Sequence, residues 1–405
     1  MNWSSSRKIA TVCAVLVLLS LVACLVFVFA YPLPEVRSDA VEYLEAAKNV
    51  AGGKGFTQDG ITPMVYRPPL FSVLLGGWFF LTGTSSVFSA AIFQSLLHAL
   101  GVSAAFFLFL ALTPSLPWAA GASVFLAVNP LLVTRVVFVL QEPTILLFTT
   151  LSVLASVRLL RVPSSGKAAL AGVAWGFCTL AKIVCWFAPL LLLAMRLLPA
   201  RLRWSWRGRE AAYLLLCFTV VIGPWTIRNY LHFHRFIPVN SQGEGMLAWN
   251  VKNAEIPGEP PGRKIYEEIQ RTSHTEEKRK EAFWDYVRAH PRYFLLDRVA
   301  RNALIFGTPA LGWWISRGRF GPEKEDQTMF WALVVLGQVP LYLFLLYRSG
   351  QWIRERFSPA FGFPLLFYWL YWAEYALIWG DPRFGLAVYP VLVAVVLGSP
   401  GREAG

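Results

Sequence analysis

The feature that most constrains this chain is a series of apolar segments, each long enough to cross a membrane as a helix. A hydrocarbon core of about 30 Å requires roughly 20 apolar residues in one helix. Segments of that kind occupy 9–30, 87–112, 117–138, 143–160, 209–227, 327–347, 359–379 and 383–398. Of the 405 residues, 56% are hydrophobic and only 15% are charged, which excludes an ordinary soluble domain. The sequence therefore predicts an all-α polytopic membrane protein.

The excess of basic residues is explained by membrane topology. The formal net charge is +13, but the basic residues lie between apolar runs, as in "RLRWSWRGR" (201–209) and "YRSGQWIRER" (347–356). Lys and Arg in such positions are typical of cytoplasmic loops, and we expect no nucleic-acid partner. All five cysteines lie in apolar segments without a CxxC pair, so neither a disulfide framework nor a zinc site is indicated.

The first apolar segment, 9–30, follows Arg7 and Lys8. A cleaved signal peptide would have a shorter apolar core. "LVAC", ending at Cys24, is similar to a lipoprotein cleavage box, but six more apolar residues follow it. We therefore expect an uncleaved first crossing.

The distribution of charge predicts the topology. Residues 168–198 are interpreted as two shorter helices that meet near Lys182, and 69–83 and 298–316 as helices that dip into or lie along the outer face. This arrangement puts the basic loops in the cytoplasm, with about ten crossings and both termini inside. The unusual polar segments then share the outer face: the first outer loop 31–68, Glu142, Lys182, 228–297 and "GDPRF" (380–384). Charges at a membrane edge are costly and usually functional.

Three regions follow from this topology. Residues 1–227 form an N-terminal transmembrane module with the loop 31–68, and 298–405 form a C-terminal transmembrane region. Between them, 228–297 is expected to be an extramembrane helical region that contains one charged helix, "KIYEEIQRTSHTEEKRKEAFWDYVRAHP". Its apolar content is too low for a core of its own.

The stretch "RSDAVEYLEA" (37–46) has two interpretations. In the local one, Asp39 caps a helix, Glu42 reaches back in a capping box, and Gly52-Gly53 ends the helix. In the functional one, Asp39 belongs to a site on the outer loop, because the helix is followed by "GKGFTQDG" and by "YRPPLF", which holds Arg67 extended just before the chain re-enters the interface.

Several motifs occur in order on the predicted outer face. They are "RPPL", "QEPTILLFTTLSVL" with Glu142, "GVAWGFCTLAKIV" with Lys182, "GPWTIRNYLHFHRFIPVNSQGEG" with Arg228, and "DPRFGLAVYPVL" with Arg383. Together with the Asp39 helix, this series resembles the membrane glycosyltransferases of the GT-C fold. Within them it is similar to the bacterial branch related to protein O-mannosyltransferases and the aminoarabinose transferase of lipid A.

The resemblance implies transfer of a sugar from a polyprenyl-phosphate donor to an acceptor hydroxyl or phosphate on the outer face, with inversion. Asp39 would act as the base, with its pKa raised above about 3.9 in a shielded site. Glu142 would be a second carboxylate that orients the acceptor or Asp39. Arg67 would bind the donor phosphate, with Lys182, Arg228 and Arg383 as further contacts. Because cations can neutralise the leaving phosphate, we expect no obligatory metal or other cofactor.

Each further candidate also has an ordinary structural interpretation. Glu142 precedes Pro143 and would favour a helix dipole, and Lys182 could snorkel to the interface. Arg228 follows Trp225 as a typical membrane anchor, and Arg383 could pair locally with Asp381. Gln141 stands where the family often has Ser, and Phe384 where it commonly has Tyr. The five histidines (His98, His232, His234, His274 and His290) are scattered and predict no metal site.

Two other function classes remain open. A transporter or flippase of a lipid-linked substrate would bury paired charges at the midplane and show related halves with broken helices. A non-catalytic scaffold of an envelope assembly would need neither Asp39 nor Arg67. The expected location is a plasma (inner) membrane, with the site facing the periplasm or exterior. A lipid, glycan or protein acceptor is expected to be selected by 240–297.

Overall fold

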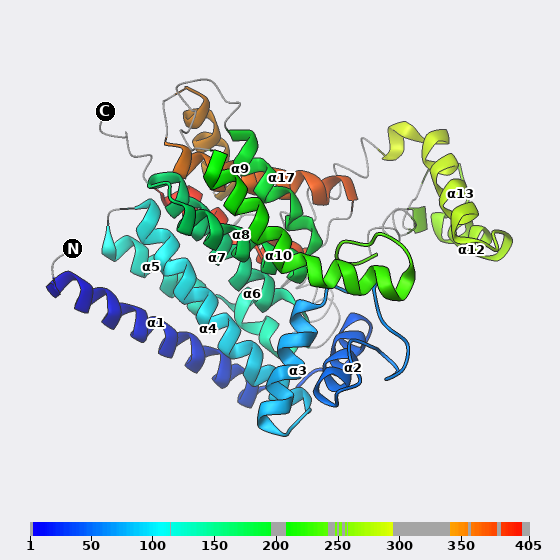
Figure 1. Cartoon of the computed structure of the whole chain (residues 1–405), viewed down its shortest axis with the longest axis horizontal. Coiled ribbons are helices and arrows are strands. Elements are labelled where there is room, and N and C mark those ends of the chain that lie inside the picture. The colour runs from blue at the N-terminus through cyan, green and yellow to red at the C-terminus, as the bar shows by residue number, and fades with distance from the viewer. Residues whose placement is uncertain are drawn as a thin grey trace.

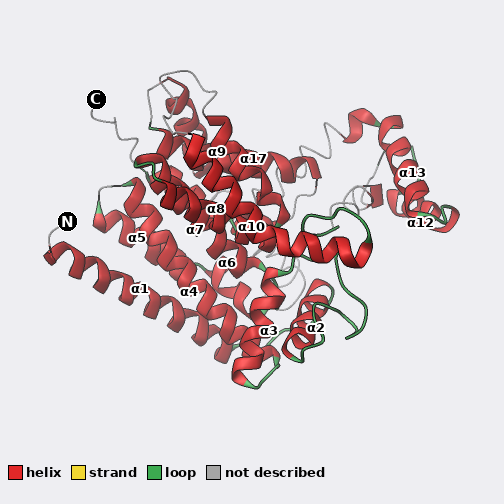
Figure 2. Ribbon diagram, in the orientation of Figure 1, coloured by secondary structure: helices red, strands yellow, loops and turns green. Residues whose placement is uncertain are grey.

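The protein is described here by a computed structural model, which covers residues 3–113, 115–195, 208–241, 248, 251–252, 256, 258–294, 341–354, 358–378 and 382–398. Within these ranges the secondary structure is helical, without strands (Figure 2). A β-bridge pairs Thr57 with Pro63. The expected all-α fold is confirmed.

The N-terminal half is a bundle of helices lying side by side (Figure 1). Its members are α1 (Trp3–Ala30), α4 (Val87–Leu112), α5 (Leu116–Ala127), α6 (Pro130–Val133), the 3₁₀ turn η1 (Thr134–Val137), α7 (Glu142–Arg161) and α8 (Ser165–Ala181). Helix α7 packs between α4 and α8, and α1 packs on α4 and α5. Four described helices, α1, α4, α7 and α10 (Gly208–Phe233), are long and apolar enough to span a membrane.

The expected crossing 117–138 is not one straight helix. Its two parts, α5 and α6–η1, meet at a bend of 47°. The break lies at Asn129-Pro130, where the Asn129 side chain accepts a hydrogen bond from the amide of Leu131 at 2.9 Å. Pro130 lacks the N–H that a continuing helix needs, so a new helix begins there.

The prediction of two shorter helices meeting near Lys182 is confirmed. Helix α8 ends at Ala181, and η2 (Ile183–Phe187) and α9 (Ala188–Ala194) follow. Lys182 itself is extended, with φ −155° and ψ 113°. Lys182 therefore lies in a break between α8 and η2 and belongs to neither helix.

Two helices lie at the end of the bundle where α1 ends (Figure 1). They are α2 (Asp39–Ala51) and α3 (Leu70–Thr82). At about 1.5 Å per residue, α3 is too short to cross a bilayer, as expected of 69–83. Tyr43 and Phe71 pack edge to face at 5.5 Å in an apolar cluster that joins both helices to α1, α4 and η1. The second segment expected to lie on this face, 298–316, is outside the described residues.

The region 228–297, predicted to be extramembrane, differs from expectation in two ways. The expected single charged helix is two, α12 (Gly262–Thr272) and α13 (Glu276–Ala289), which lie apart from the bundle in Figure 1. Thr275 starts the second helix by accepting a hydrogen bond from the amide of Lys278. The region also has a small core, because Val251, Phe283 and Phe294 are buried together.

The C-terminal part brings the chain back to the bundle. It contains α17 (Pro359–Ile378), α18 (Pro382–Leu386) and α19 (Tyr389–Leu397). The expected crossing 383–398 is therefore two short helices, because the chain turns before Pro390 at the start of α19. Helix α17 packs on α7, and α19 on α4 and α5. Most of the expected crossing 327–347 lies outside the described residues.

Candidate active site

Asp39 is the first residue of α2, and its side chain does not cap that helix. Ser38 occupies the N-cap position with φ 53° and makes no side-chain cap hydrogen bond. The carboxylates of Asp39 and Glu42 are both bound to arginines instead. The capping-box interpretation is therefore wrong, whereas the expected end of the helix at Gly52 is confirmed.

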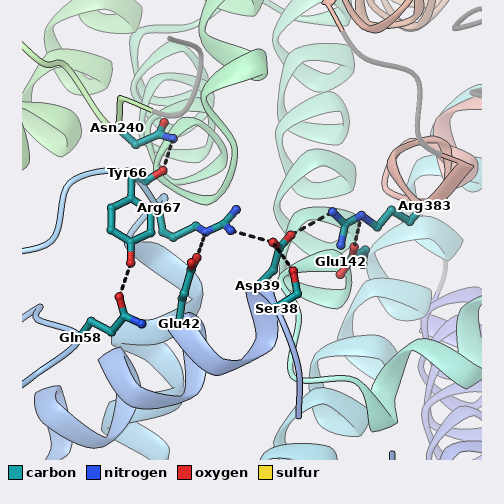
Figure 3. A network of polar contacts seen from close by, with 9 residues as sticks. All are labelled: Ser38, Asp39, Glu42, Gln58, Tyr66, Arg67, Glu142, Asn240 and Arg383. Atoms are coloured by element: carbon teal, nitrogen blue, oxygen red, sulfur yellow. Dashed lines mark hydrogen bonds and ion pairs between the residues drawn. The ribbon is translucent and has the colours of Figure 1, made fainter. Parts of the chain in front are cut away.

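Two arginines from distant parts of the chain hold the two oxygens of Asp39 (Figure 3). Arg67 Nη2 donates to Oδ1 at 2.7 Å, and Arg383 Nη2 donates to Oδ2 at 2.9 Å. Arg67 Nε also donates to Glu42 Oε2. Arg383 Nε lies 3.8 Å from Glu142 Oε1, an ion pair that extends the cluster to α7. Three carboxylates and two arginines thus form one connected network.

The network is largely removed from water. Arg67 and Glu142 are only 9% and 6% exposed. Removing one partner from a buried ion pair typically costs about 3–5 kcal/mol, because the other charge is left unpaired. The local Asp381 partner expected for Arg383 lies outside the described residues. Within them, Arg383 pairs with Asp39 and Glu142.

The acidity of Asp39 differs from expectation. Burial alone would raise its pKa, but the charges of Arg383 and Arg67 and their hydrogen bonds outweigh burial and lower the pKa below its ordinary value. The expected raised pKa is therefore wrong for the cluster as it stands. Asp39 is ionised and tightly paired.

Arg67 is presented by a tightly held loop between α2 and α3. The Asn49 side chain donates to the carbonyls of Thr57 and Gln58, each at 3.1 Å. The backbone of the loop turns at Asp59, whose carboxylate accepts hydrogen bonds from two following amides at 2.7 and 2.9 Å. Asn240 Nδ2 donates to the carbonyl of Tyr66 at 3.0 Å, directly before Arg67.

Arg228 belongs to this scaffold and not to the charged network. Its guanidinium donates to the carbonyls of Met64 at 2.8 Å and Phe56 at 3.1 Å. It also lies over the ring of Trp225, with 4.9 Å between Cζ and the ring centroid. The structure does not bring Arg228 to Asp39. Its interactions fit a clamp that fastens the Arg67 loop to α10.

Lys182 does not snorkel outward, because it is only 5% exposed. Its ammonium group lies 4.2 Å from the centroid of the Phe384 ring, next to Arg383 in the sequence. With its amide oriented to match its neighbours, Gln141 accepts from Lys182 Nζ at 3.1 Å and donates to the Tyr43 hydroxyl at 3.1 Å. Lys182 is thus held at the edge of the network.

Three members of the site were not predicted as functional: Glu42, Gln141 and Tyr43. The sequence predicts Glu42 only as part of a capping box, although its position one turn after Asp39 puts both carboxylates on one helix face. Gln141 and Tyr43 carry no charge and have no distinctive local pattern, so only their contacts reveal them.

No group of three or more His, Cys, Asp or Glu side chains within the described ranges is arranged to hold a metal ion. The carboxylates of the network are already paired with arginines. The independence from divalent metal stays a prediction.

Two comparisons bear on the family and the fold. A family model described as dolichyl-phosphate-mannose-protein mannosyltransferase matches residues 60–237, a stretch that includes Arg67, Glu142 and Lys182. Among solved structures, the Archaeoglobus fulgidus oligosaccharyltransferase, tethered to an acceptor peptide containing the NVT sequon, superimposes with a TM-score of 0.53 at 12% identity. The chain has the GT-C fold. The resemblance to GT-C glycosyltransferases is thereby confirmed, and the protein is an all-α membrane protein.

The structural match covers 98% of this chain but 50% of the oligosaccharyltransferase, so the chain spans about half the length of that protein. The search of curated proteins gave no match.

Proposed function

We propose that this GT-C protein is a membrane glycosyltransferase that moves a sugar from a polyprenyl-phosphate donor to an acceptor hydroxyl or phosphate at the outer face. The observation that carries the proposal is the Asp39 carboxylate held between Arg67 and Arg383. This arrangement combines a candidate base with cations suited to a phosphate, where the first loop meets the C-terminal helices.

The arginines supply the donor-phosphate contacts in this proposal. Arg67 uses Nε and Nη2 for carboxylates, and within the described ranges its Nη1 makes no hydrogen bond. A phosphate bound there would compete with the carboxylates for both guanidinium groups, because Arg presents a fixed fork of donors. Lys182 would add a third positive charge near the leaving phosphate.

Phosphate binding would also change Asp39. When Arg67 and Arg383 turn to the phosphate, the interactions that lower the pKa of Asp39 weaken, and its basicity rises. Asp39 then accepts the proton of the acceptor hydroxyl while the acceptor oxygen attacks the anomeric carbon. The bond from that carbon to the phosphate oxygen breaks, and the polyprenyl phosphate leaves with the electron pair. Attack opposite the leaving group gives inversion. A phosphate acceptor, already ionised, needs no such proton transfer.

The transporter or flippase alternative is less well supported. A transporter would bury its paired charges at the midplane between related halves. Here the charged network joins the start of α2, the start of α7 and α18, at the end of the bundle that carries α2 and α3 (Figures 1 and 3).

The proposal is tested by transfer of radiolabel from a panel of polyprenyl-phosphate sugars to membrane acceptors. We expect Asp39→Asn to insert and fold but to lose transfer by roughly 10²–10⁴-fold, the usual contribution of a general base.

Arg67→Ala should raise the donor concentration needed for half-maximal rate, with Arg263→Ala on the exposed face of α12 as control. Adding EDTA should leave wild-type transfer unchanged. Transfer by Asp39→Asn at the wild-type rate would exclude Asp39 as the base, and no transfer from any donor by folded wild type would favour the transporter.

A further inference from the structure

A small cavity lies against Glu142, and its lining residues are buried. It is lined by His98 from α4, Arg135 from η1, Glu142 from α7 and Leu386 from α18, with further apolar side chains. The centre of a water molecule can move within a volume of about 10 Å³ in this cavity. That is close to the space one buried water occupies.

The cavity has polar groups on an otherwise apolar wall. His98, Arg135 and Glu142 are 1%, 3% and 6% exposed. Within the described ranges, His98 Nε2 and Glu142 Oε2 are buried without a hydrogen-bond partner in the protein. Buried polar atoms are nearly always hydrogen-bonded, and a buried water usually makes two to four such bonds.

We propose that one water molecule occupies this cavity and joins His98 Nε2 to Glu142 Oε2, which makes His98 and Arg135 positioning residues for the active site. The inference rests on the proposed function. A water has two donors and two acceptors, so it can donate to Glu142 Oε2 and also bond either tautomer of His98. Arg135 lines the same cavity, so its positive charge attracts the Glu142 carboxylate from that side.

The orientation of the Glu142 carboxylate influences Asp39 through two ion pairs, Glu142–Arg383 and Arg383–Asp39. The terminal torsion of a glutamate side chain is broad, so its carboxylate needs contacts to fix its orientation. A water that donates to Oε2 fixes the carboxylate so that Oε1 faces Arg383 Nε at 3.8 Å. Arg383 in turn donates to Asp39 Oδ2 at 2.9 Å. His98 and Arg135 thus orient the arginine that holds the candidate base, without touching substrate.

The first test separates positioning from general stability. His98→Leu should lower kcat roughly tenfold by misplacing the base, with KM for the donor nearly unchanged. His98→Gln, whose amide replaces the ring Nε2, should recover most of the rate. Arg135→Lys should retain more rate than Arg135→Met. Ser95→Ala is the matched control, because Ser95 is buried in the same helix but donates to the carbonyl of Ala91. A kcat for His98→Leu equal to that of Ser95→Ala would overturn the proposal.

A second test does not depend on sugar transfer. Thermal unfolding is measured for His98→Leu, Glu142→Gln and the double variant in detergent. If one water joins the two side chains, the decrease in Tm of the double variant should be smaller than the sum of the single decreases. Additive decreases would overturn the shared water even if the enzyme activity is established. Should His98→Leu not fold, His98→Phe keeps a ring without the nitrogen and serves in the same cycle.

Discussion

Asp39 is the residue at which three parts of the chain meet. Its oxygens bind Arg67 from the first loop and Arg383 from the C-terminal part, and Arg383 also pairs with Glu142. The sequence indicated these residue types and their common face. Their pairing was not predictable, because 344 positions separate Asp39 from Arg383 and no local pattern encodes such a contact.

The lowered pKa of Asp39 makes its stabilising contribution dependent on pH. Because the pKa in the folded protein lies below that of the unfolded chain, the contribution is complete above about pH 4 and is lost as the pH falls through the folded value. The difference in Tm between wild type and Asp39→Asn should therefore be largest near neutral pH and decrease below about pH 4. Thermal unfolding of both proteins over this range measures it. A difference that stays constant with pH would show that Asp39 is not ionised in the folded protein.

Arg228 acts by geometry, and its replacement by lysine should show this. Lysine keeps the charge but cannot present the planar fork that reaches the carbonyls of Met64 and Phe56. We expect Arg228→Lys to increase hydrogen exchange in residues 56–66 and to lower the transfer rate through Arg67. Arg263→Lys, in an exposed ion pair on α12, is the control. Unchanged hydrogen exchange in residues 56–66 would show that Arg228 does not fasten this loop to α10.

At the scale of elements, close contact between α8 and α10 positions the helix that holds the Arg67 loop. A Cβ at Gly172 would lie 2.3 Å from the carbonyl oxygen of Leu214, and one at Gly176 would lie 2.6 Å from Val221 Cβ. Glycine at these positions lets the two helices approach. Helix α10 then carries Trp225 and Arg228 to the Arg67 loop.

Gly172→Ala should force α8 and α10 apart. Overpacking of this kind typically costs about 1–3 kcal/mol, so we expect a lower Tm and, through the displaced clamp, a lower transfer rate. Gly166→Ala is the matched control in the same helix, because a Cβ there meets no atom within 4 Å. Equal Tm values for the two variants would contradict the close-contact argument.

At the scale of the whole molecule, the charged site lies at one end of the helix bundle, as the predicted topology expects. The site lies at the end of the bundle that carries α2 and α3, and α1 begins at the other end (Figure 1). The five cysteines at 13, 24, 178, 185 and 217 are free thiols in helices or turns of the bundle, and three of them (13, 24 and 217) lie in segments expected to span the membrane. Added surface cysteines can therefore report sidedness.

The predicted topology is tested with a membrane-impermeant thiol reagent on sealed cells. Lys54→Cys in the Arg67 loop and Glu268→Cys on α12 are exposed and should react from outside. Arg161→Cys, exposed at the end of α7, should react only after the membrane is opened. Labelling of Arg161→Cys in sealed cells would reverse the predicted orientation.

The sequence by itself determined the all-α membrane fold, the break at Lys182 and the candidate residues Asp39, Arg67, Glu142, Lys182 and Arg383. Hydrophobic length, proline position and charge are local properties that a single chain displays directly. The structure also shows the bend at Asn129 and the division of the charged helix into α12 and α13, which have local causes in Pro130 and in the Thr275 cap. Only the tertiary structure decided the clamp role of Arg228 and the buried pairing of Asp39 with two arginines, because these depend on contacts between distant segments. The direction of the Asp39 pKa depends on how close the two arginines come, which the sequence pattern does not specify.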